Sequence, residues 1–132
     1  MKCILDSAAA YALTQRDDQY HEKARLFVRD QATEFVLTSI VAGECYTLML
    51  GKVGYGRAME WRRSLDMSPL ITVHLLDASD EAEIWNVLRQ YAGVPLSYAD
   101  ASLVVLGQKV GITSIFTFDS DFRQAGMHVV PG

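Results

Sequence analysis

The chain lacks the features that mark membrane proteins, disulfide frameworks and proteins that coat nucleic acid. No apolar run among its 132 residues reaches the roughly 20 residues that a membrane-spanning helix needs. Its two cysteines, Cys3 and Cys45, lie in expected core segments without CxxC spacing, which predicts reduced, buried thiols. A formal net charge of −4 argues against binding nucleic acid by bulk electrostatics. We therefore expect a cytoplasmic protein without membrane association.

Several catalytic motifs are also missing. His21, His74 and His128 have no metal-ligand spacing, and no serine or cysteine lies in a nucleophile elbow. The run of glycines at 51, 54 and 56 faintly resembles a phosphate-binding loop, but it follows an expected helix and lacks Gly-Lys-Ser/Thr. A turn between two helices is the better interpretation. These absences weigh against acyl transfer and zinc-dependent hydrolysis.

The composition predicts a single packed domain. Hydrophobic residues make up 50% of the chain and charged residues 21%, a balance typical of a folded globule. A chain of this size buries roughly two-thirds of its unfolded surface and needs no covalent staple. No repeat, linker or low-complexity tract divides the sequence, so we expect one domain over residues 1–132.

Short apolar segments alternate with helical patterns along the chain. We expect strands at Lys2–Leu5, Phe35–Leu37, Thr72–Leu75, Ser114–Phe118 and His128–Val130. We expect helices at Ser7–Leu13 and Tyr20–Gln31, one capped by Thr38 or Ser39 that runs to Leu50, and one at Arg57–Leu65. We then expect one capped by Ser79 with Ile84, Trp85, Leu88 and Tyr91 on one face, and one opened by Ser97 that runs to Val110. Strands separated by helices throughout predict an α/β fold with a mainly parallel sheet covered on both sides.

Four carboxylates lie in apolar sequence, and they are Asp6, Glu44, Asp100 and Asp119. Asp6 and Asp119 follow strands, which places them at the carboxyl ends where open α/β sheets bind ligands. Glu44 is four residues from both Ile40 and Leu48, so we expect it on the apolar stripe of its helix.

Each acid has a simpler interpretation when it is taken alone. Asp6 and Asp119 are good helix caps, and Asp100 with Ser97 resembles a capping box. Glu44 could pair with an arginine or lie at the edge of its stripe. A single cluster of ionised carboxylates without a neighbouring Lys or Arg replaces all of these explanations and indicates a divalent cation. Hard oxygen ligands favour Mg²⁺ or Mn²⁺.

The chain resembles the PIN-domain ribonucleases, especially the short VapC-type toxins of type II toxin-antitoxin systems. The likeness extends over nearly the whole length, through ILDSAAAYAL, QYHEKA, TSIVAGECYTL, LSYADAS and TFDSDFRQAGMHVVP. It implies a three-layer α/β/α fold whose sheet of about five strands has the order 3-2-1-4-5. It implies catalytic acids at Asp6, Glu44, Asp100 and Asp119, with Ser7, Thr117 and Asp121 beside them.

The resemblance implies metal-dependent hydrolysis of RNA phosphodiester bonds. One or two Mg²⁺ or Mn²⁺ ions would be held by Asp6, Asp100 and Asp119, with Glu44 binding directly or through water. Glu44 would orient or deprotonate the attacking water, while Ser7 and Thr117 fix carboxylate rotamers.

The implied partners are an RNA substrate, a cognate antitoxin and a second copy of the chain. We expect the antitoxin near the helical hairpin at 48–65, where three glycines depart from the family pattern. For the homodimer, we expect spare apolar helix surface around Tyr55, Met59 and Trp61.

Other functions stay open at this point. An RNA-processing nuclease of the same family could act without an antitoxin. A catalytically silent α/β interaction domain is disfavoured by four intact acids. Aspartyl phosphoryl transfer would need an acidic pair or DxD at the first strand and a matching lysine, which Asp6-Ser7-Ala8 does not provide.

Overall fold

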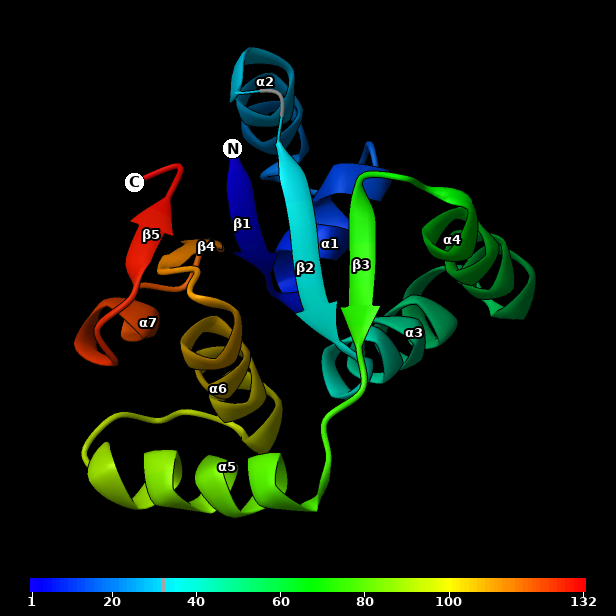
Figure 1. The fold of residues 1–132 in the computed structure, drawn as a ribbon. Coiled ribbons are helices and arrows are strands. Elements are labelled where there is room, and N and C mark those ends of the chain that lie inside the picture. Colours follow the sequence, from blue (N-terminus) through cyan, green and yellow to red (C-terminus); the bar gives the residue numbers. More distant parts are fainter. Residues whose placement is uncertain (32) are drawn as a thin grey trace.

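Five parallel strands form the centre of the structure, in the order β3-β2-β1-β4-β5 (Figure 1). The computed structural model describes residues 1–31 and 33–132. The strands are β1 (Lys2–Leu5), β2 (Glu34–Thr38), β3 (Ile71–His74), β4 (Ser114–Phe116) and β5 (His128–Val130). Ile4 of β1 pairs with Val36 on one side and with Ile115 on the other. The carboxyl ends of the strands therefore meet at one edge of the sheet, as predicted.

Helices cover both faces of this sheet. They are α1 (Ser7–Thr14), α2 (His21–Gln31), α3 (Ser39–Val53), α4 (Tyr55–Met67), α5 (Ala78–Gln90), α6 (Tyr98–Val110) and α7 (Asp121–Gln124). In Figure 1, α1 lies behind the strands and α6 in front of them, and α6 contacts β1 and β2. The predicted three-layer α/β/α arrangement is confirmed.

Some predicted details of the helices were wrong. Gly51 lies inside α3 and Gly56 inside α4, and Gly54, with φ of 90°, alone separates the two helices. Helix α5 is capped by Asp77 and not by Ser79. The Asp77 carboxylate accepts a hydrogen bond from the Asp80 amide at 2.9 Å, and Asp80 accepts one in return from the Asp77 amide at 3.0 Å. The short α7 was not predicted, because a single turn is too brief to show periodicity.

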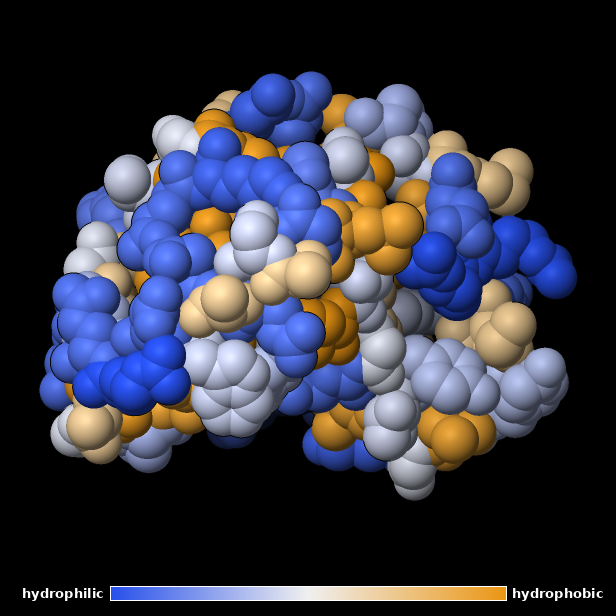
Figure 2. Space-filling view, turned by 60° about the horizontal axis from the view of Figure 1, so that its bottom comes forward, coloured by the Kyte–Doolittle hydropathy of each residue, from blue (hydrophilic) through white to orange (hydrophobic). Residues whose placement is uncertain are grey.

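The core lies between the sheet and its helices. Phe116 of β4 contacts Phe27 of α2 and Phe35 of β2 at ring-centroid distances of 5.1 and 5.5 Å. Cys3 and Cys45 are buried and unpaired, as predicted. Trp85 does not join the buried face of α5, since 48% of its surface is exposed. In the face shown by Figure 2, hydrophobic residues occur in separate patches among hydrophilic ones.

No helix within the described residues is long and apolar enough to cross a membrane.

Candidate active site

Asp6 lies at the end of the central strand β1 and is the most buried of the predicted acids, with 7% of its surface exposed. Its Oδ1 accepts a hydrogen bond from the Ala9 amide at 2.8 Å, so it caps α1. Its Oδ2 accepts a hydrogen bond from the Thr117 hydroxyl, which follows β4. The capping interpretation is therefore correct, and it leaves Asp6 at the sheet edge that the metal interpretation requires.

The pKa of Asp6 reflects the burial of its carboxyl at this edge of the sheet. Burial is the largest influence and raises its pKa to about 6, against the lowering effect of the bonds from Thr117 and Ala9. The nearby charges of Asp100 and Asp119 raise this pKa further. Burial, followed by the charges of Asp6 and Glu44, likewise raises the pKa of Cys45 to about 12, so this thiol stays protonated.

Glu44 reaches the same edge from helix α3. The Ser7 hydroxyl, in the first turn of α1, donates a hydrogen bond to Glu44 Oε1 at 2.5 Å. Glu44 itself is exposed, so the prediction that it lies on the buried stripe was wrong. The buried face of α3 is formed by Val41, Ala42, Cys45 and Met49. Glu44 lies next to that face, where its carboxylate can turn toward α1 and remain in water.

Asp100 belongs to a capping box at the start of α6. Its Oδ2 accepts a hydrogen bond from the Ser97 amide, and its own amide donates to the Ser97 hydroxyl, both at 3.0 Å. Asp100 is half-buried. Burial raises its pKa, and the charges of Glu44 and Asp119 add to that effect.

Asp119 is exposed and is fixed by the segment around it. Its amide donates to the Thr117 hydroxyl at 3.0 Å, and its Oδ1 accepts from the Asp121 amide at 2.9 Å. Thr117 thus connects two of the acids, as its predicted supporting role requires. Asp121 contributes its backbone amide here, and a role for its carboxylate stays a prediction.

The four acids form one electrostatic cluster, to which we refer as the acid cluster. The charges of Asp100 and Asp119 raise the pKa of Asp6, and the charges of Glu44 and Asp119 raise the pKa of Asp100. Across residues 1–31 and 33–132, none of the four forms an ion pair with a basic side chain. These groups come from four separate segments of the chain.

The donor set of the acid cluster fits a hard divalent cation, because it offers only oxygen atoms and an excess of negative charge. The carboxylates are not yet arranged around a common point: in the described part of the chain, no three acidic, histidine or cysteine side chains form a ready metal-binding group. Each of the four is instead held through a carboxylate oxygen by a protein donor. The residues therefore fit a cation in the chemistry of their donor atoms, and binding one would require the carboxylates to move together and some of their oxygens to exchange partners.

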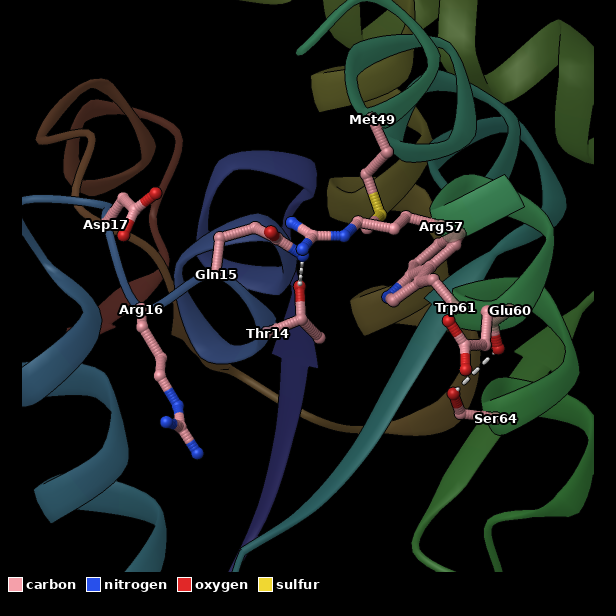
Figure 3. Close-up of a pocket in the computed structure, with 9 residues that line it drawn as sticks. All are labelled: Thr14, Gln15, Arg16, Asp17, Met49, Arg57, Glu60, Trp61 and Ser64. Carbon is pink, nitrogen blue, oxygen red and sulfur yellow. Dashed lines mark hydrogen bonds between the residues drawn. The ribbon is translucent and has the colours of Figure 1, made fainter. Parts of the chain in front are cut away.

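A hollow lies away from the acid cluster, between the end of α1 and helices α3 and α4 (Figure 3). Its volume is about 600 Å³. Arg57 extends across it toward Thr14 and Gln15, between Met49 and Trp61 in this view. No predicted site residue lines this hollow, so it belongs to a different surface.

Residues 3–127 match the PIN domain. The chain belongs to the PIN-domain family. A curated PIN-domain relative, the 23S rRNA-specific endonuclease VapC20 of Mycobacterium tuberculosis (strain CDC 1551 / Oshkosh), is 26% identical over 123 residues, which are 93% of each chain. The resemblance to VapC-type PIN-domain ribonucleases that we inferred from the sequence is confirmed.

Solved structures share the PIN-domain fold. The crystal structure of Mycobacterium tuberculosis VapC20, described as a sarcin-ricin loop cleaving toxin, superposes with a TM-score of 0.86 at 24% identity and covers 95% of both chains. FitAcB from Neisseria gonorrhoeae superposes with a TM-score of 0.67 at 16% identity, covering 98% of this chain and 96% of that one. The structural agreement thus extends over nearly the whole chain.

Proposed function

We propose that this PIN-domain protein is an endoribonuclease and the toxin of a toxin-antitoxin pair. The observation that carries the proposal is the acid cluster, in which four carboxylates from separate segments gather at the carboxyl edge of the sheet without a basic partner among the described residues. Gathering like charges lowers stability, so the cluster needs a functional explanation. The VapC20 relative, which acts on 23S rRNA, supports RNA as the substrate.

The cofactor that suits this donor set is Mg²⁺ or Mn²⁺. Asp6, Asp100 and Asp119 would hold it, with Glu44 binding directly or through water. When bound, the cation would lower the pKa of a water molecule and offset the negative charge on the scissile phosphate.

The chain's own residues position the reaction. The Ala9 amide and Thr117 hydroxyl fix the Asp6 carboxylate in one rotamer. Ser7 holds Glu44, whose exposed carboxylate can orient or deprotonate the attacking water. Hydrolysis by water needs no nucleophilic side chain, in agreement with the absence of a nucleophile motif from the sequence.

The proposal is tested with four single variants, Asp6→Asn, Glu44→Gln, Asp100→Asn and Asp119→Asn. Each keeps the side-chain shape and removes the charge. With an RNA hairpin carrying the sarcin-ricin loop, and with total RNA, we expect Mn²⁺-dependent cleavage by the wild type and its loss in each variant, with circular dichroism unchanged. Cleavage that persists in all four, with or without EDTA, would contradict the proposed mechanism.

We further propose a cytoplasmic antitoxin complex and a homodimer. Tyr55 and Met59 of α4 expose 64% and 40% of their surfaces, whereas Trp61 is buried and cannot contribute as predicted. With the neighbouring hollow, this α3–α4 surface suits an apolar segment of an antitoxin. A monomeric mass by light scattering at micromolar concentration would contradict the dimer, and antitoxin binding that survives polar substitution of Tyr55 and Met59 would contradict the placement.

A further inference from the structure

A second group of side chains lies beside the acid cluster and, apart from Thr117, has no part in the chemistry proposed above. These side chains line a hollow of about 160 Å³ formed by the residue before α2, the first turn of α2, the segment after β4, α7 and the carboxyl end of the chain. Thr117 belongs to both sites, because it lines the hollow and its hydroxyl donates to Asp6. The hollow therefore adjoins the acid cluster through Thr117.

Two aromatic rings form one wall of this hollow. Tyr20 stacks on Phe118 with ring centroids 4.3 Å apart and an angle of 8° between the planes. Phe118 in turn meets the edge of the buried Phe116 at 5.8 Å, which anchors the stack in the core. Tyr20 is also held through its backbone, whose amide donates to Asp18 and whose carbonyl accepts from Ala24, both at 2.9 Å. The outer ring is thus rigidly placed, yet 40% of Tyr20 is exposed.

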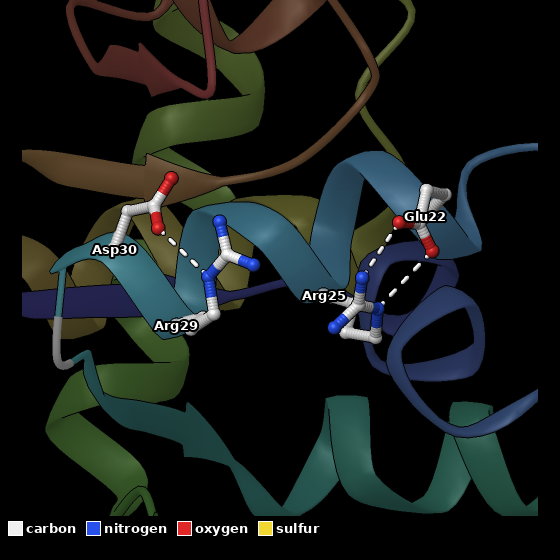
Figure 4. Close-up of polar contacts among 4 residues, drawn as sticks. All are labelled: Glu22, Arg25, Arg29 and Asp30. Carbon is white, nitrogen blue, oxygen red and sulfur yellow. Dashed lines mark hydrogen bonds and ion pairs between the residues drawn. The ribbon is translucent and has the colours of Figure 1, made fainter.

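Two basic side chains, Lys23 of α2 and Arg123 of α7, line the same hollow. The arginines of α2 are neutralised by their neighbours, Arg25 by Glu22 and Arg29 by Asp30 (Figure 4). By contrast, neither Lys23 nor Arg123 forms an ion pair with any residue that the structure describes. Their charges are available to an anion in a protein whose net charge is negative.

We infer that Tyr20, Phe118, Lys23 and Arg123 form an RNA-binding subsite that receives one unpaired nucleotide next to the scissile phosphate. Unpaired bases stack on exposed aromatic rings, and their phosphates bind lysine and arginine. At about 160 Å³ the hollow is small, which suits one base ring or one phosphate group. The inference rests on the proposed action on RNA.

The subsite is tested by fluorescence anisotropy with a short, fluorescein-labelled single-stranded RNA of mixed sequence, in a Glu44→Gln background that leaves the RNA uncut. We expect Tyr20→Ala to weaken binding about ten-fold, the scale of one lost base stack, and Tyr20→Phe to restore it. Trp85→Ala is the matched control, because Trp85 is an exposed aromatic residue on α5 outside the hollow.

Charge and turnover provide independent measurements. We expect Lys23→Ala to reduce the slope of log affinity against log salt by about 0.7, the value for one lost phosphate contact on a single strand, with Lys52→Ala as control. In protein with Glu44 intact, we expect Tyr20→Ala to raise KM while kcat stays close to the wild-type value.

Equal RNA binding by Tyr20→Ala and wild type, or an equal loss in Trp85→Ala, would overturn the subsite. So would a Tyr20→Ala variant that loses binding to the cognate antitoxin and keeps its affinity for RNA. If wild type cuts no RNA but binds it in a Tyr20-dependent way, the proposed nuclease function fails and the subsite stands. If wild type cuts RNA with a KM that Tyr20→Ala leaves unchanged, the nuclease function stands and the subsite fails.

Discussion

The buried charge of Asp6 predicts that removing it stabilises the metal-free protein. The pKa of this carboxyl is raised from 3.8 to about 6, a difference of about two pH units. At 1.36 kcal/mol for each unit, the ionised carboxylate lowers the free energy of unfolding by about 3 kcal/mol above pH 6. Asp6→Asn removes this charge and keeps an oxygen for the Ala9 amide.

The sign of the effect depends on pH. Below pH 3.8 the carboxyl is protonated in both the folded and unfolded states, so it contributes nothing. Between 3.8 and about 6 the folded state binds a proton that the unfolded state releases, and wild-type stability falls as the pH rises. Weakening the bond from Thr117 offsets the gain by about 1 kcal/mol. We therefore expect Asp6→Asn to be more stable by about 2 kcal/mol at pH 8, with the gain gone by about pH 4.5.

Urea unfolding followed by circular dichroism in EDTA, at both pH values, measures this difference. Asp77→Asn is a suitable control, since Asp77 also caps a helix but a backbone hydrogen bond from Asp80 lowers its pKa. We expect no gain at pH 8 in that variant. If Asp6→Asn is destabilised equally at both pH values, Asp6 is only a cap and the argument from buried charge is wrong.

Three further predictions concern Thr117, the divalent cation and the ion pair between Lys109 and Asp80. Thr117→Val should lower kcat for RNA cleavage about 10- to 100-fold, because Asp6 loses its hydroxyl donor, whereas Thr117→Ser should retain most activity. At about 100 times its Kd, Mn²⁺ should stabilise wild type by about 3 kcal/mol in thermal unfolding and should stabilise Asp6→Asn far less. Lys109→Met should remove the 2.7 Å ion pair with Asp80 that links α6 to α5, and it should lower the midpoint of thermal unfolding without changing RNA cleavage.

Local sequence patterns determined the strands, most of the helices and the position of Asp6 at a strand end. These features depend on residues only a few positions apart. Apolar runs define strands, 3.6-residue periodicity defines helices, and caps such as Ser97 with Asp100 bond within one turn. The order of the strands came from the likeness of the whole chain to the PIN-domain ribonucleases and not from any single segment.

Contacts between distant segments were decided by the tertiary structure. Ser7 bonds to Glu44 across 37 positions, and Thr117 bonds to Asp6 across 111. Periodicity placed Glu44 on the apolar stripe of α3, which was wrong, because the edge of that stripe depends on how α3 packs against α1. The stack of Tyr20 on Phe118 had no local signal at all, because the packing of α2 against the end of β4 brings the two rings together. The sequence thus identified the acids individually, and only the parallel sheet, together with the packing of α3 and α6 on it, assembled them with their hydroxyl and aromatic neighbours at one edge.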